Sequence, residues 1–145
     1  MGFAILDVDD VLLCVAEASY SGMAQVQRAL QRHLAARDAQ RVCEAFGRHL
    51  STLAARLHQA GTPAPAYVQL RARLEHLQEP ILRAGYDLKE WSRQAVLACA
   101  LIDCDIAPGR RVIDDAADAY WRHIEEKAGL HVDVADFVGA LSVSA

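Results

Sequence analysis

Apolar residues recur at steps of three and four along most of the chain, and this spacing predicts a mainly α-helical protein. The clearest helix is expected over about 38–60, with an apolar stripe formed by Val42, Phe46, Leu50, Leu53 and Leu57. Further helices are expected over about 15–36, 66–81 and 110–128, with a short one from Asp133 to Leu141. The first of these would bury Met23, Val26, Leu30 and Leu34, and the 110–128 helix Val112, Ile113, Ala116, Ala117, Tyr120, Trp121 and Ile124.

Turn-forming residues separate these helices. The segment "GTPAP" at 61–65 stops the second helix, since Gly61 suits a helix end and the prolines prevent continuation. The segment "APG" at 107–109 precedes the fifth helix. Pro80 should kink the third helix or end its regular hydrogen bonding early, because proline has no backbone N–H.

The fourth segment, "AVLACALI" at 95–102, is apolar all round. Such a run fits either a buried central helix or a buried strand, and its periodicity does not distinguish them. Its alanine and cysteine positions favour the helix. Asp87, with Glu90 three residues later, is expected to begin this helix as a capping box, and Asp38 is expected to cap the second helix.

The opening stretch, "AILDVDDVLL" at 4–13, has a different pattern. The apolar run "FAIL" predicts a short buried strand, and acids follow it directly. On an extended chain the side chains of Asp7 and Asp9 point to the same side, while Val8 turns toward the packing. Two converging carboxylates repel each other unless a cation or a proton lies between them, and Mg²⁺ prefers carboxylate oxygens. The pattern therefore suggests a Mg²⁺ site at the tip of the strand.

This stretch resembles the first motif of the haloacid dehalogenase-like (HAD) hydrolases, an apolar strand followed by Asp-x-Asp and further apolar residues. Here the motif is Asp7-Val8-Asp9-Asp10-Val11-Leu12, near the N-terminus as in that family. The resemblance implies that Asp7 is the nucleophile that forms an aspartyl-phosphate and that Asp9 is the general acid and base. It further implies that the Asp7 carboxylate and the Asp9 main-chain carbonyl hold Mg²⁺. The second acid favours phosphate-ester hydrolysis over dehalogenation.

The same resemblance gives a division of the chain. Residues 1–13 would form the core strand and motif loop, 14–130 a helical cap-like region, and 131–145 the start of further core or a C-terminal helix. The expected fold is thus a short N-terminal strand followed by a helical cap-like bundle of five to six helices, a partial HAD-like α/β fold. A cap of this kind shields the reaction from water and selects the substrate.

The later motifs of the family are not identifiable. "RVIDDAAD" at 111–118 has paired acids after apolar residues, but the same residues fit the predicted 110–128 helix, which we favour. Lys89 and Lys127 lie in helix-like charged surroundings, and Ser144 is the one candidate for the family's serine or threonine. We therefore expect either a fragment or split form of a HAD-like phosphatase, or a non-catalytic helical interaction module with a vestigial motif.

Composition and charge narrow the remaining possibilities. The chain of 145 residues carries a net charge of −4 and is 53% hydrophobic, as expected of one folded domain. Residues 21–84 hold nine arginines and four acids, which suits pairing with the acidic 85–145 segment or an anionic small ligand, although a solvated helix face is the favoured interpretation of the arginines. The resemblance implies that such a ligand is a small phosphorylated substrate. The 6% aromatic residues and the acidic total do not favour nucleic acid. Neither a signal peptide nor a membrane span is expected, so a cytoplasmic location is predicted. A homo-oligomer or partner chain could cover the N-terminal strand. The four cysteines have no metal-binding spacing and are expected to be free thiols.

Overall fold

The protein is mainly α-helical. A computed structural model describes residues 15–57, 61–83 and 91–127, and within these ranges it contains no β-strand. It comprises five helices: α1 (Val15–Leu30), α2 (Ala36–Leu57), α3 (Pro65–Arg83), α4 (Arg93–Asp103) and α5 (Arg110–Lys127). The expected mainly helical class is therefore confirmed. The strand predicted before Asp7 and the helix predicted from Asp133 to Leu141 lie outside the described residues.

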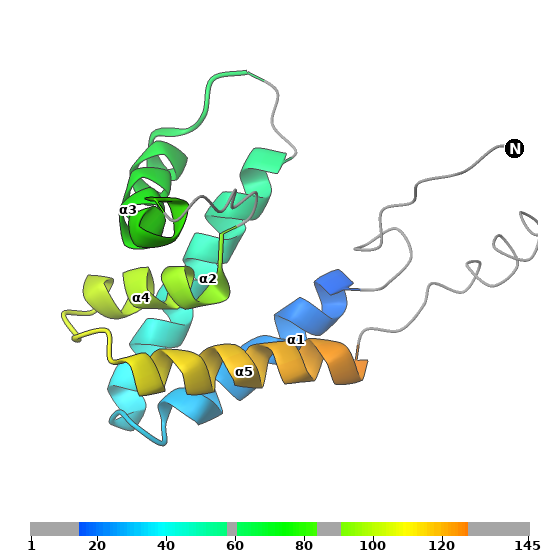
Figure 1. The fold of residues 1–145 in the computed structure, drawn as a ribbon. Helices are drawn as coiled ribbons and strands as arrows, with labels where there is room; N and C mark the ends of the chain where they lie inside the picture. Colours follow the sequence, from blue (N-terminus) through cyan, green and yellow to red (C-terminus); the bar gives the residue numbers. More distant parts are fainter. Residues whose placement is uncertain (1–14, 58–60, 84–90, 128–145) are drawn as a thin grey trace, which may run out of the picture.

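The first and last helices form an antiparallel pair. Ser21 of α1 contacts His123 of α5, and His33, just after α1, contacts Asp115, so residue numbers rise along one helix as they fall along the other. Figure 1 shows the N-terminal end of α1 and the C-terminal end of α5 on the same side of the molecule. The chain therefore enters and leaves the helical unit at one end of this pair.

The segment 95–102 forms part of a central helix, so the favoured helical alternative is confirmed. In α4, every residue from 95 to 101 is buried, which explains the absence of a polar face. α4 packs against α2, α3 and α5 (Figure 1). A helix that is apolar on all sides needs neighbours on all sides, and these three helices provide them.

The predicted apolar stripes form the core that surrounds α4. In α2, Val42 and Phe46 are fully buried, while Leu50 and Leu53 are partly buried against the core. The Phe46 ring meets the Tyr120 ring of α5 edge to face, with centroids 5.9 Å apart and an interplanar angle of 87°. Such a pair adds stabilisation beyond its buried area. α2 and α5 therefore contact each other through two buried rings.

One core prediction is wrong. Trp121 is 41% exposed, although its spacing in the 110–128 helix predicted burial. It lies at the edge of the buried face, where its ring packs edge to face against Tyr120. The guanidinium carbon of Arg93 lies 5.5 Å from the Trp121 ring centroid and 5.6 Å from that of Tyr120. Trp121 thus serves as a cation–π partner at the surface.

Several helix ends differ from the sequence predictions. α1 ends at Leu30, and a turn over residues 31–34 replaces its expected last turn. α2 already begins at Ala36, so Asp38 lies in the first turn and is not the cap; its carboxylate pairs with Arg41 at 3.3 Å. An acid in this place still interacts favourably with the helix dipole.

The boundaries of α3 and α4 also differ from expectation. α3 continues through Pro80 to Arg83, so proline does not end the helix. The residue that caps α4 is Ser92, whose side chain accepts a hydrogen bond from the backbone N–H of Ala95. Asp87, the expected cap, lies outside the described residues. Gly61 adopts φ +104°, which confirms it as a residue suited to breaking the chain after α2.

The described cysteines are free and buried. Cys43, Cys99 and Cys104 form no disulfide, as their spacing predicted, and Cys14 lies outside the described residues. Among the helices that the structure describes, none has the length and apolar character needed to cross a membrane.

Candidate functional site

The two predicted catalytic and metal-binding residues, Asp7 and Asp9, lie outside the described residues. The arrangement of these two side chains therefore stays a prediction from the sequence. Within 15–57, 61–83 and 91–127, no group of three or more His, Cys, Asp or Glu side chains is arranged to hold a metal ion. The described helices instead contribute polar contacts between helices and two surface cavities.

A serine–histidine pair lies toward the end of the α1–α5 pair where the chain enters and leaves. Ser21 Oγ is 2.7 Å from His123 Nε2, a hydrogen bond between the two helices. Next to it, a Cβ at Gly22 would lie 3.4 Å from the Tyr120 ring and 3.5 Å from the His123 ring, which is ordinary van der Waals contact between α1 and α5. This end of the unit therefore presents a hydroxyl and an imidazole close to the point where residues 1–14 join α1.

The paired acids of "RVIDDAAD" lie in α5, which confirms the helical interpretation of this segment. Asp114 pairs with Arg110 of the same helix at 3.3 Å. Asp115 contacts His33 Nε2 at 2.7 Å and Arg32 at 4.0 Å, across the far end of the α1–α5 pair. The hydrogen bond from His33 holds the pKa of Asp115 below its usual value. Both acids are thus engaged in ion pairs between or along helices.

A second charged cluster joins three helices. The Asp103 carboxylate at the end of α4 lies 2.9 Å from His49 Nε2 of α2 and 2.7 Å from Arg73 Nη2 of α3. Burial lowers the pKa of His49, and the nearby Asp103 opposes this effect. The cluster holds α2 and α3 at the C-terminal end of α4.

Beside this cluster, a groove of about 320 Å³ runs between α3 and α4. Its lining residues are Ala72, Arg73, His76, Leu77, Cys99 and Ile102. Leu77 is 36% exposed and Ile102 44% exposed, so the groove is an apolar surface feature. Burial raises the pKa of the Cys99 thiol, and a protonated thiol is a poor nucleophile.

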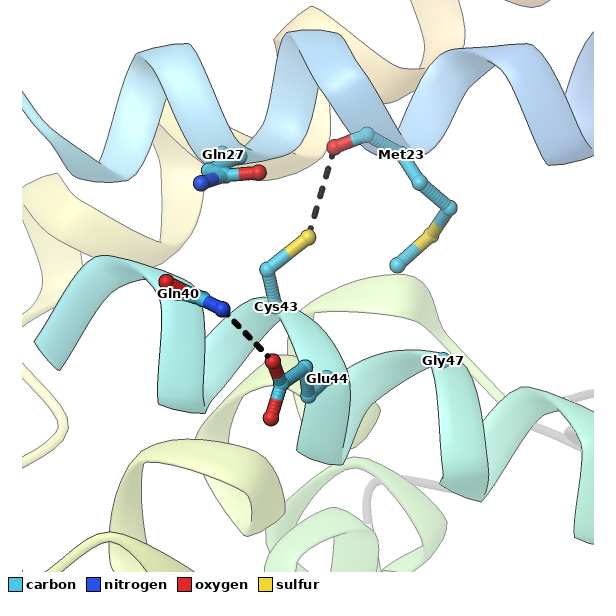
Figure 2. A pocket seen from close by; sticks show the side chains of 6 residues that line it. All are labelled: Met23, Gln27, Gln40, Cys43, Glu44 and Gly47. Atoms are coloured by element: carbon cyan, nitrogen blue, oxygen red, sulfur yellow. Dashed lines mark hydrogen bonds between the residues drawn. The ribbon is translucent and has the colours of Figure 1, made fainter. Parts of the chain in front are cut away.

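A second pocket, of about 420 Å³, lies between α1 and α2 and is shown in Figure 2. It is lined by Met23, Gln27, Gln40, Cys43, Glu44 and Gly47. The Cys43 thiol donates a hydrogen bond to the Met23 carbonyl at 3.3 Å, and Gln40 donates one to Glu44 at 3.0 Å (Figure 2). Burial, aided by the charge of Glu44, raises the pKa of Cys43. The thiol is therefore protonated at neutral pH and engaged as a donor.

A further polar group lies at the N-terminus of α4 and was missed by the sequence prediction. Gln78 of α3 is 2% exposed, and its Oε1 accepts a hydrogen bond from the Ser92 backbone N–H at 3.1 Å. Its Nε2 is buried without a partner among the described residues. The sequence did hold a signal, because Gln78 continues the buried stripe of Leu70 and Leu74 at the next four-residue step.

The sequence matches no protein-family model, and comparisons with curated proteins and with solved structures give no match either. The case for a function therefore depends on the residues and their geometry.

Proposed function

We propose that the chain is a Mg²⁺-dependent phosphatase of the HAD-like type, acting on a small phosphate ester, with the described helices as its cap. The observation that carries the proposal is the stretch Asp7-Val8-Asp9-Asp10 at the end of an apolar run. It is supported by the antiparallel pairing of α1 and α5, which brings both ends of the helical unit together (Figure 1). An insertion into another fold needs its entry and exit at one place.

The proposed chemistry uses the two acids in different roles. The Asp7 carboxylate attacks phosphorus and forms an aspartyl-phosphate, while Asp9 donates a proton to the leaving oxygen. Asp9 then removes a proton from water, which attacks the aspartyl-phosphate and releases inorganic phosphate. Mg²⁺, the cofactor that the resemblance implies, would offset the negative charge of carboxylate and phosphate when bound.

The test is hydrolysis of an aryl phosphate by the purified full chain, with and without Mg²⁺. We expect turnover that requires Mg²⁺ and falls at least roughly a thousandfold in Asp7→Asn, because the nucleophile is lost. Asp10→Asn is the matched control, since it changes a neighbouring acid without an assigned role, and it should retain turnover.

The same experiment separates this proposal from the alternative, a non-catalytic helical interaction module with a vestigial motif. Absence of Mg²⁺-dependent turnover in the unmodified chain would contradict the phosphatase and favour the module. Equal turnover in Asp7→Asn and the unmodified chain would contradict the assignment of Asp7 as nucleophile.

A further inference from the structure

Two sulfur-containing side chains on facing helices line the same pocket. Met23 of α1 and Cys43 of α2 both line the cavity of about 420 Å³, and Figure 2 shows their sulfur atoms between the two helices. The Cys43 thiol lies 3.3 Å from the backbone carbonyl of Met23, so it contacts the residue that carries the thioether. Thiolate and thioether are the soft metal ligands among protein side chains. The pocket therefore combines two soft ligands from two helices.

Gly47 provides the space in which the end of the Met23 side chain lies. Cys43 and Gly47 are four residues apart in α2, so they are neighbours on one face of the helix, with Cβ positions about 5–6 Å apart. A Cβ at Gly47 would lie 3.3 Å from Cε of Met23, which is tighter than ordinary contact. The Met23 methyl group therefore lies about one helix turn from the thiol. Because methionine has three rotatable side-chain bonds, its sulfur can adjust to an ion held by Cys43.

The other lining residues do not make a site for zinc. Gln40 donates a hydrogen bond to the Glu44 carboxylate at 3.0 Å, so this carboxylate already has a partner. No histidine belongs to the described lining of the pocket. Zinc is almost always held by four ligands in structural sites and by three side chains in catalytic sites. A soft ion that binds two sulfur ligands fits this set better.

We propose that the pocket binds a monovalent copper ion, Cu(I), through Cys43 Sγ and Met23 Sδ. The ion replaces the thiol proton, which passes to water, and no electron is transferred. Burial raises the pKa of Cys43 because it disfavours the charged thiolate. A thiolate bound to Cu(I) is neutral overall, so burial does not oppose it in the same way. Gln40 and Glu44 are exposed, so solvent reaches the pocket.

Loss of the thiol proton breaks the Cys43 hydrogen bond but leaves no backbone acceptor unsatisfied. Met23 lies inside α1, so its carbonyl still accepts the regular helix hydrogen bond from the Gln27 N–H. The site uses none of the groups assigned to the phosphatase reaction and does not depend on that proposal. Cys99 offers a natural comparison, because it lines the groove between α3 and α4, whose described lining contains no methionine.

The test is a titration of the full chain with Cu(I), supplied as its acetonitrile complex without oxygen, and followed by NMR of ¹³C-labelled methionine methyl groups. The chain contains two methionines, Met1 and Met23, so Met1 serves as an internal reference. We expect the Met23 methyl signal to shift and to saturate at a single equivalent, with little change at Met1. No shift at Met23, or an equal shift at Met1, would overturn the proposal. A larger Met23 shift with Zn²⁺ at equal concentration would overturn the assignment to Cu(I).

Variants test each sulfur atom separately. Cys43→Ala should abolish the Met23 shift, whereas Cys99→Ala, the matched control, should leave it unchanged. Met23→Leu keeps a similar volume but removes the thioether, so Cu(I) affinity should fall at least roughly tenfold, as measured by competition with a coloured Cu(I) chelator. A Met23 shift that survives in Cys43→Ala would show that the thiol does not hold the ion. Unchanged Cu(I) affinity in a Met23→Leu protein with the unmodified circular dichroism spectrum would show the same for the thioether, and either result overturns the site.

Discussion

Substitutions at Gly22 test how closely α1 and α5 pack against each other. The residue lies inside α1, and a Cβ there would lie 3.4 Å from a Tyr120 ring atom and 3.5 Å from a His123 ring atom, which is ordinary van der Waals contact. Gly22→Ala should therefore fit. Because glycine in a helix interior is less favourable than alanine, we expect this change to raise the free energy of unfolding by about 0.5–1 kcal/mol.

A larger side chain at the same position should have the opposite effect. Leucine and alanine have similar helix propensities, so a difference between the two variants measures packing. The additional atoms of Gly22→Leu must enter space next to Tyr120, which is 1% exposed and packs against Phe46. Overfilling a packed interior costs about 1–3 kcal/mol. Gly22→Leu should therefore be less stable than Gly22→Ala by about this amount.

The assay is urea unfolding followed by far-UV circular dichroism, with the midpoint and slope fitted for each variant. Ala24→Leu is the matched control, since Ala24 is exposed on the same helix and its replacement adds leucine where nothing is overfilled. It should change stability by less than about 0.5 kcal/mol. Equal stability of Gly22→Leu and Gly22→Ala would refute the argument that α1 and α5 are in close contact at this position.

Two further predictions concern the core and the charged cluster. Phe46→Ala should lower the free energy of unfolding by about 3–5 kcal/mol, because it removes a fully buried ring and its contact with Tyr120. Urea unfolding measures this loss of stability. A loss below about 1 kcal/mol would contradict the prediction. Burial lowers the pKa of His49, so between that lowered value and the ordinary value of about 6.5 the unfolded chain binds a proton that the folded chain does not. Stability should therefore rise with pH across this window, and His49→Gln should flatten the rise; an unchanged slope would show that His49 does not cause it.

The helices could be predicted from the sequence because their signal is local. The apolar stripe through Val42 and Phe46 and the all-round apolar run at 95–102 each predict a helix from a few neighbouring residues. The ends were less predictable. The start of α4 is set by Ser92 and by Gln78, which lies fourteen residues earlier and meets it only after folding. Trp121 was misjudged for a related reason, since a helix face does not reveal which of its edge positions a neighbouring helix covers.

The polar contacts between helices could not be predicted from spacing. Ser21 and His123 are 102 residues apart in the sequence, and no local pattern links them. The same holds for Asp103, which meets one residue of α2 and one of α3. By contrast, the assignment of Asp7 and Asp9 depends on adjacent residues, so the sequence could suggest it directly. Local chemistry was therefore accessible from the sequence, whereas contacts that depend on the packing of helices were not.

The packing of the helices allows the effect of Asp7→Asn on turnover to be distinguished from an effect on folding. The described core is formed by residues of α1 to α5 and of their connections, and both ends of the unit lie at one end of the α1–α5 pair. A charge-neutralising change at Asp7 removes none of these core contacts. If Asp7 acts in catalysis, Asp7→Asn should abolish turnover while the urea midpoint of the helical signal stays unchanged. A large fall in that midpoint would instead indicate that Asp7 supports the fold, and lost turnover would then be no evidence for a nucleophile.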